Sequence, residues 1–219
     1  MILVEVLSRE EAERARHVLM SAPFRDGRLT AGPAARLVKE NEQAAGDHAG
    51  VAALAQSLRT ALQDSPTFQA LVRPLRWSRL LFSRYVAGQR YGQHTDDAAM
   101  ADEHGWPLRT DVSFTVFLSE PDTYDGGELK LIDLGSERTF KPAAGTAVLY
   151  ATGLIHEVLP VTSGTRLAGV GWVQSLVRRA DQRELLFDLA CARRELPEGK
   201  GLLHLDNAVG NLLRMWGER

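Results

Sequence analysis

Six short apolar or alternating segments between residues 78 and 175 constrain the fold of this 219-residue chain more than any other feature. Clusters of glycine, proline, aspartate and serine separate them, and no helical pattern lies between them. Strands spaced in this way indicate an antiparallel sandwich or barrel of jelly-roll type, rather than a parallel sheet with crossover helices. The segments are SRLLFSRYVAG, DVSFTVFLSE, GELKLIDL, GTAVLYA, HEVLPV and TRLAGVGWVQS.

Helical patterns flank this β region on both sides. Ser8 and Glu11 have the spacing of a capping box that begins a helix, and residues 47–62 have helical periodicity. The helical period returns after Asp181. We therefore expect a mainly β chain of the α+β class in three parts: an N-terminal helical segment that packs on the core (1–76), a β core (77–178) and a C-terminal helical segment (179–219).

Composition and charge exclude several classes of partner. The 26 basic and 28 acidic residues are mixed along the chain and leave a net charge of -2, so no basic patch indicates nucleic acid and no polybasic segment indicates a membrane. The single cysteine, Cys191, cannot form an internal disulfide, and the N-terminus lacks the pattern of a signal peptide. We expect a cytoplasmic protein that acts on a small-molecule or peptide substrate.

The sequence RYGQHTDDA at residues 90–98 contains a candidate pair of metal ligands. Residues two apart in a strand point to the same face, so His94 and Asp96 can present a nitrogen and an oxygen to one ion. The H-x-D spacing is common by chance, and His94 is equally compatible with an ordinary polar role. A third ligand on a neighbouring strand would distinguish these interpretations.

His156 and Arg166 extend the candidate site. His156 begins the apolar run HEVLPV, where a hydrogen-bonded core histidine is the commoner interpretation. Two histidines and one carboxylate nevertheless form the facial ligand set of non-haem Fe(II) oxygenases. Arg166 lies among apolar residues, and a buried guanidinium requires an anion. This anion is either an acidic side chain, such as Glu157 or Asp111, or the distal carboxylate of 2-oxoglutarate.

Several motifs in order resemble those of the bacterial PKHD-type hydroxylases, relatives of the prolyl 4-hydroxylases within the Fe(II)/2-oxoglutarate-dependent dioxygenases. The resemblance covers most of the chain and is strongest from about residue 77 to residue 190. It implies a double-stranded β-helix core and an enzyme that uses O2 and 2-oxoglutarate, forms succinate and CO2, and hydroxylates an unidentified substrate, with ascorbate as a candidate reductant. The motifs are RYxxGxxYxxHxD (84–96), FLSEPDTYDGGEL (117–129), HEVxPVTSGTR (156–166) and GWVQS (171–175).

The resemblance also implies roles for individual residues. It makes His94, Asp96 and His156 the iron ligands, and Arg166 the partner of the distal carboxylate of 2-oxoglutarate. Tyr85 is a candidate contact to the co-substrate or to a water near iron, and a half-buried strand tyrosine is the equal alternative.

Other positions leave alternatives open. Tyr91 has the same two interpretations as Tyr85. Phe117 stands where several prolyl hydroxylases have a tyrosine that assists the arginine, and Ala168 stands where other oxygenases have serine or threonine. These two departures put the details of the co-substrate pocket in doubt, but they do not affect Arg166.

Two further segments have alternative interpretations. Residues 98–108 follow the H-x-D pair and form either a lid over the open coordination face or a solvated loop, in which His104 and Trp106 either meet substrate or face water. The apolar residues between 202 and 216 either pack on the barrel or form a contact in a homo-oligomer.

Alternatives to the hydroxylase function come from different classes. A non-catalytic iron-binding or iron-responsive β-barrel is the main one, but a module without turnover has no need of Arg166 on the next strand. A zinc hydrolase would require a general base and a different ligand preference. The presence of Asp96 argues against a halogenase, whereas demethylation stays open beside hydroxylation.

Overall fold

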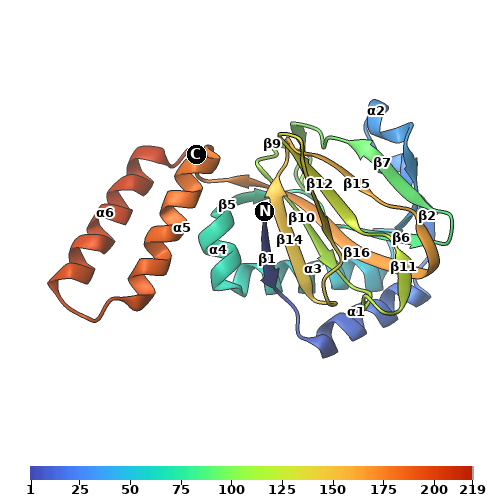
Figure 1. Ribbon diagram of the computed structural model, residues 1–219, viewed down its shortest axis with the longest axis horizontal. Coiled ribbons are helices and arrows are strands. Elements are labelled where there is room, and N and C mark those ends of the chain that lie inside the picture. Colours follow the sequence, from blue (N-terminus) through green and yellow to red (C-terminus); the bar gives the residue numbers. More distant parts are fainter. Residues whose placement is uncertain (219) are drawn as a thin grey trace.

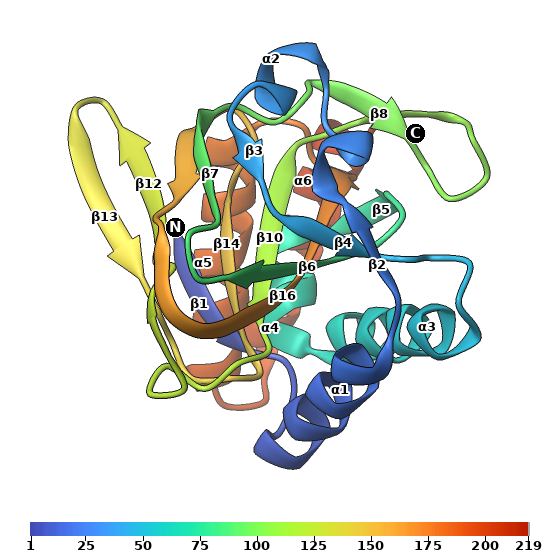
Figure 2. The same ribbon diagram turned by 90° about the vertical axis from the view of Figure 1, so that its right-hand side faces the viewer.

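The computed structural model describes residues 1–218, which form two antiparallel β-sheets that pack face to face, with helices on the outside (Figures 1 and 2). The larger sheet contains nine strands and the smaller sheet contains five. This arrangement is the jelly-roll type of sandwich that the strand spacing predicted. The larger sheet comprises β1 (Ile2–Glu5), β2 (Phe24–Asp26), β4 (Glu42–Ala44), β5 (Pro74–Trp77), β6 (Leu81–Val86), β10 (Val112–Phe117), β11 (Tyr124–Gly126), β14 (Thr146–Ala151) and β16 (Val161–Ser175).

Strand order explains how distant segments meet. The larger sheet has the order β1-β14-β10-β16-β6-β4-β2, and β11 and β5 also pair with β16. The smaller sheet has the order β13-β12-β15-β7-β3, and β8 and β9 form a separate hairpin. These remaining strands are β3 (Lys39–Glu40), β7 (Arg90–His94), β8 (Ala99–Ala101), β9 (Pro107–Arg109), β12 (Leu129–Asp133), β13 (Ser136–Phe140) and β15 (Ile155–Val158).

Helices cover one face of the larger sheet. Leu19, Leu58 and Phe68 come from three different helices and belong to the same buried cluster as Phe82 and Phe114 of the sheet. Burial of each such side chain contributes about 1.5–3 kcal/mol. These helices are α1 (Arg9–Ser21), α3 (Ala49–Asp64) and α4 (Pro66–Val72); short turns of helix, η1 (Gly27–Thr30) and α2 (Pro33–Arg36), lie between them in sequence.

A second buried cluster holds the two sheets together. Phe117, Val148 and Tyr150 of the larger sheet pack against Leu129 and Leu131 of the smaller sheet. Apolar contacts therefore join the inner faces of the two sheets. The polar side chains on these faces are not part of this apolar cluster.

The N-terminal segment differs in part from the helical prediction for residues 1–76. Helices α1, α3 and α4 are present, and Ser8 and Glu11 form the predicted capping box. The helical prediction was wrong where β2, β3 and β4 extend both sheets, whereas the helical turns η1 and α2 lie between β2 and β3. These strands have only two or three residues, which is too few to show a period of two, and the polar Lys39 and Gln43 occupy buried positions.

The C-terminal helices α5 (Ala180–Glu195) and α6 (Lys200–Trp216) confirm the predicted return to helix. They form a helical hairpin that projects from the core on the side of α4 (Figure 1). No described residue of α6 is buried, so α6 packs on α5 rather than on the sheets. Within residues 1–218, no helix is both long enough and apolar enough to cross a membrane.

Gly171 provides a test of the packing between β16 and the neighbouring strands. A Cβ atom on Gly171 would lie 2.6 Å from Leu80 Cδ2 and 2.6 Å from Phe114 Cζ. Because the core is already filled, we expect Gly171→Ala to lower the free energy of unfolding by about 1–3 kcal/mol in urea denaturation. Gly153→Ala is the control, since a Cβ there meets nothing within 4 Å. Equal destabilisation by the two substitutions would contradict this account of the core.

Candidate metal centre and cavity

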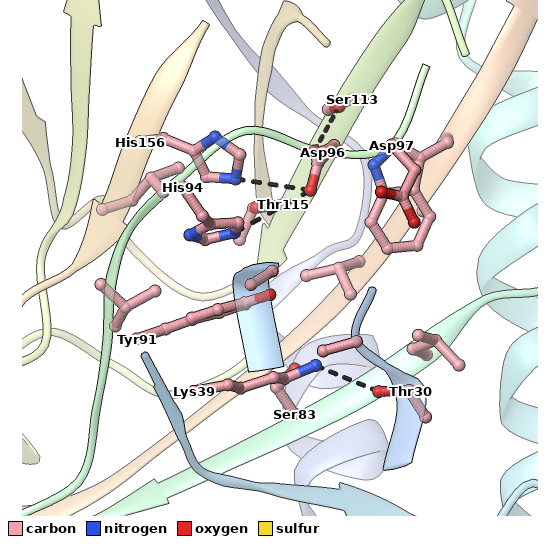
Figure 3. A pocket seen from close by; sticks show the side chains of 18 of the residues that line it. Thr30, Lys39, Ser83, Tyr91, His94, Asp96, Asp97, Ser113, Thr115 and His156 are labelled. Atoms are coloured by element: carbon pink, nitrogen blue, oxygen red, sulfur yellow. Dashed lines mark hydrogen bonds and ion pairs between the residues drawn. The ribbon is translucent and has the colours of Figure 1, made fainter. Parts of the chain in front are cut away.

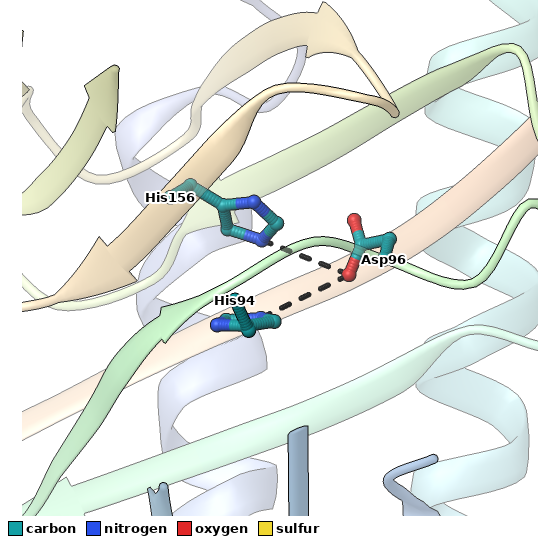
Figure 4. A group of neighbouring side chains, drawn as sticks. All are labelled: His94, Asp96 and His156. Atoms are coloured by element: carbon teal, nitrogen blue, oxygen red, sulfur yellow. Dashed lines mark ion pairs between the residues drawn. The ribbon is translucent and has the colours of Figure 1, made fainter. Parts of the chain in front are cut away.

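The pairing of β7 with β15 brings two histidines side by side. His94 lies directly opposite His156 in this antiparallel pair, and their ring centroids are 4.2 Å apart. Asp96 follows the end of β7, and its Oδ1 atom lies 3.9 Å from Nε2 of His94 and 3.6 Å from Nε2 of His156 (Figure 4). The structure thus brings together the three side chains that the sequence predicted as ligands.

Backbone contacts orient both imidazole rings. His94 Nδ1 lies 2.8 Å from the carbonyl oxygen of Gly92, and His156 Nδ1 lies 3.0 Å from that of Leu154. A carbonyl oxygen only accepts, so each Nδ1 carries a hydrogen and each Nε2 is the ring nitrogen left to bind a metal. Burial is the main cause that lowers the pKa of His94 to about 4, so this ring is neutral at pH 7, as a metal ligand must be.

A serine on the larger sheet fixes the carboxylate. Ser113 donates a hydrogen bond from Oγ to Oδ2 of Asp96 at 2.8 Å, and Ser113 Oγ also lies 3.1 Å from Thr152 Oγ1. Oδ1 of Asp96 is therefore the oxygen that faces the imidazoles. Sequence reasoning missed Ser113, although a polar residue in the buried run VSFTVF was a signal that could have identified it.

Asp96 Oδ1 lies close enough to each imidazole for the pair to share one divalent transition-metal ion. Metal–ligand distances of about 2.0–2.2 Å allow two donors separated by up to about 4.2 Å to share one ion. The separations of 3.6 and 3.9 Å are within this limit, and they are too long for direct hydrogen bonds. The donor set of two imidazoles and one carboxylate is the one that non-haem Fe(II) enzymes use.

A cavity between the two sheets contains this centre (Figure 3). Its empty volume, counted with its open mouth, is about 740 Å³. Polar and aromatic side chains from both sheets line the cavity around the three candidate ligands. They include Lys39, Tyr85, Tyr91, Tyr150, Arg166 and Trp172.

Arg166 is the largest fully buried side chain of the described residues, with an exposed fraction of 1%. It lies on β16 opposite Tyr85 of β6. Its guanidinium carbon is 5.1 Å from the ring centroid of Tyr85 and 4.9 Å from that of Phe117. Aromatic faces stabilise a cation only partly, so this buried guanidinium still requires an anion.

No acidic side chain within residues 1–218 pairs with Arg166, and its Nε atom has no hydrogen-bond partner. Asp111 binds Arg109 instead, with an N–O distance of 2.8 Å. Glu157 lies 3.5 Å from the ammonium of Lys130. The salt-bridge alternative for Arg166, with Glu157 or Asp111 as the partner, is therefore wrong.

The Gly126–Gly127 turn makes room for Arg166. The register of β11 shifts between Asp125 and Gly126, which marks a β-bulge or irregularity at this turn. Gly127 has φ +68°, and a Cβ on it would lie 3.0 Å from Cδ of Arg166 and 3.1 Å from Cε2 of Tyr124. The buried hydroxyl of Tyr124, which sequence reasoning missed, has no partner among the described residues.

Tyr85 and Tyr91 both line the cavity, as expected of residues that precede the ligand pair. Tyr85 is 3% exposed, and burial raises the pKa of its hydroxyl. Tyr91 stacks on the imidazole of His94 at a centroid distance of 3.6 Å.

The segment 98–108 forms most of the β8–β9 hairpin. In it, Met100 is half-buried and Leu108 is buried. Met100 lines the cavity. His104 and Trp106 do not line the cavity. The side chain of His104 is 74% exposed, and Trp106 as a whole residue is 63% exposed. The function of this hairpin as a lid stays a prediction.

Comparisons with known proteins agree with the geometry. The profile of the 2OG-Fe(II) oxygenase superfamily matches residues 80–174, which include the three candidate metal ligands, Arg166 and Tyr85. A PKHD-type hydroxylase of a Picosynechococcus species is 46% identical over 218 residues, which cover 98% of this chain and 97% of the relative. A PKHD-type hydroxylase of Maricaulis maris is 46% identical over 220 residues, which cover 99% and 98%.

A solved structure supports the fold. The prolyl-4-hydroxylase of Pseudomonas putida aligns with a TM-score of 0.52 and 21% identity, covering 80% of this chain and 91% of that chain. The core is thus a double-stranded β-helix. Because the identity to the relatives extends over nearly the whole length, the chain belongs to the PKHD-type hydroxylases of the 2OG-Fe(II) oxygenase superfamily and is an Fe(II)- and 2-oxoglutarate-dependent dioxygenase.

Proposed function

We propose that His94, Asp96 and His156 hold the Fe(II) ion, that Arg166 binds the distal carboxylate of 2-oxoglutarate, and that the enzyme hydroxylates a small-molecule or peptide substrate. The observation that carries this proposal is the convergence of three metal donors in one cavity with a buried guanidinium that lacks an anion. A metal-binding module without turnover would require the donors but not the guanidinium.

The chain supplies three donors, so the remaining positions of an octahedral ion are available to small molecules. When iron and 2-oxoglutarate are bound, they supply an oxidation in which O2 and 2-oxoglutarate are converted to succinate and CO2 while one oxygen atom enters a C–H bond of the substrate. Two imidazole ligands and one carboxylate ligand would leave a divalent ion with a net positive charge. Ser113 keeps Oδ1 of Asp96 turned toward that ion.

The environment of Arg166 suits a carboxylate ligand. An unpaired buried charge costs several kcal/mol, and a planar guanidinium binds a carboxylate through two parallel hydrogen bonds. The ring of Tyr85 lies against the guanidinium and supports its orientation. We assign Tyr85 to the co-substrate pocket for this reason. Tyr124, whose buried hydroxyl has no hydrogen-bond partner among the described residues, lies near Arg166 beside Gly127.

The walls of the cavity limit the access of water to the metal centre. Tyr91 covers one face of the His94 ring, and Tyr150 lies 5.1 Å from the His156 ring between centroids. Both rings are apolar over most of their surface, so the reacting groups lie in surroundings of lower polarity than water. Trp172 also faces this cavity, and its indole N–H has no partner among residues 1–218.

The metal ligands can be tested by spectroscopy. Under anaerobic conditions, we expect the wild-type protein with Fe(II) and 2-oxoglutarate to show a weak visible metal-to-ligand charge-transfer band. His156→Ala removes one donor and should abolish the band. His104→Ala is the matched control, because this histidine is exposed and outside the cavity, and it should retain the band. An unchanged band in His156→Ala would contradict the assignment.

The role of Arg166 predicts opposite effects on stability and on binding. Arg166→Met removes an unpaired buried charge, so the melting temperature of the protein without ligands should stay the same or rise. The increase in melting temperature caused by Mn(II) and 2-oxoglutarate should be lost, and the Kd of 2-oxoglutarate should rise about tenfold or more. Arg14→Met, on an exposed arginine of α1, should change neither property. An unaltered Kd in Arg166→Met would exclude this role.

A further inference from the structure

Lys39 is a second buried cation in the cavity, and it lies outside the region that the superfamily profile matches. It is 5% exposed and belongs to β3, where it lies opposite Tyr91 of β7. Figure 3 shows its ammonium on one side of the Tyr91 ring and the imidazole of His94 on the other. Lys39 therefore lies one aromatic ring away from the metal centre.

The ammonium of Lys39 has little compensation for its burial. Nζ donates one hydrogen bond to Oγ1 of Thr30 at 3.0 Å and lies 5.0 Å from the ring centroid of Tyr91. Among the described residues, no carboxylate is within ion-pairing distance of it, whereas Lys130 pairs with Glu137 at 2.7 Å. Burial is the main cause that lowers the pKa of Lys39 to about 8.

Gln43 gives an independent indication that this part of the cavity binds a polar group. It is 4% exposed and lines the cavity together with Lys39. Its Nε2 atom donates to Oγ of Ser83 at 2.8 Å, but its Oε1 atom has no partner within residues 1–218. A buried acceptor without a partner costs about 1–3 kcal/mol, which a bound hydrogen-bond donor would recover.

Lys39 and Arg166 approach the cavity from different sheets. Lys39 belongs to the edge strand β3 of the smaller sheet, and Arg166 belongs to β16 of the larger sheet. With the ligands of the proposed function in place, the two charges of Fe(II) and the charge of Arg166 balance Asp96 and the two carboxylates of 2-oxoglutarate. Asp97 also lines the cavity, but no ion pair joins it to Lys39, so the Lys39 ammonium stays without an adjacent carboxylate among the described residues.

We propose that Lys39 recognises a carboxylate on the primary substrate, so that this dioxygenase acts on a carboxylic acid rather than on a neutral compound. A single ammonium beside a single hydroxyl suits a singly charged group, whereas a phosphate dianion requires more donors. This inference rests on the proposed function, because it assigns 2-oxoglutarate to Arg166 and leaves Lys39 for the substrate.

The test uses butanoate and butanamide as probes that differ in charge but have the same carbon chain. The protein is loaded with Mn(II), a paramagnetic ion, and saturated with 2-oxoglutarate, so that the co-substrate pocket is filled. Nuclear relaxation of the probe protons then reports binding close to the ion. We expect enhanced relaxation of butanoate and at least about tenfold weaker binding of butanamide, because a hydrogen bond between charged groups is lost.

Variants connect this selectivity to Lys39. We expect Lys39→Met to weaken butanoate binding about tenfold or more and Lys39→Arg to restore part of it, since Arg keeps the charge. Lys200→Met is the matched control, because Lys200 is an exposed lysine at the start of α6. The Kd values of Mn(II) and 2-oxoglutarate should be unchanged in Lys39→Met, which distinguishes this residue from Arg166.

The outcomes separate the two proposals. If the wild-type protein does not bind Mn(II) and 2-oxoglutarate together, the proposed function itself is wrong. If it binds both, but butanoate fails to bind, binds no better than butanamide, or binds equally well to Lys39→Met, only the role of Lys39 is overturned. The comparison of butanoate with butanamide requires no variant, so it stays decisive even if Lys39→Met fails to fold.

Discussion

The pairing register of β15 with β7 is the constraint on which the site depends. It places His156 directly opposite His94, and it places Val158 opposite Tyr91 after a local shift. Because side chains alternate along a strand, a slip of one residue would turn one of the imidazoles to the other face of the sheet. The same sheet carries Lys39 at its edge, so the metal centre and the wall that faces substrate are set by one continuous pattern of backbone hydrogen bonds.

Two buried cations, Arg166 and Lys39, face this cavity, and within residues 1–218 neither forms an ion pair with an acidic side chain. In a protein selected only for stability, apolar residues of similar volume would serve better than unpaired charges. Their presence is consistent with ligands that bring their own carboxylates. On this account, the protein without ligands holds Arg166 and Lys39 at a cost in stability, and binding of 2-oxoglutarate and then of substrate removes that cost in two steps.

Much of the core could be predicted from the sequence because its strands are long enough to show a pattern. His94 and Asp96 were identifiable from their spacing of two, which a strand would place on one face, although β7 ends at His94 and Asp96 follows it. The lack of an acidic partner for Arg166 could not be deduced, since Glu157 and Asp111 were plausible partners until the fold showed them beside other cations. Lys39 gave no signal, because its strand has only two residues and its burial depends on pairing with β7.

The most direct test is a crystal structure of the protein with Fe(II) and 2-oxoglutarate, prepared without oxygen and measured with anomalous diffraction at the iron absorption edge. The account predicts one anomalous peak bound by Nε2 of His94, Nε2 of His156 and Oδ1 of Asp96, with the distal carboxylate of 2-oxoglutarate on Arg166. A peak outside this group of donors, or a distal carboxylate on Lys39 with Arg166 left unpaired, would contradict it.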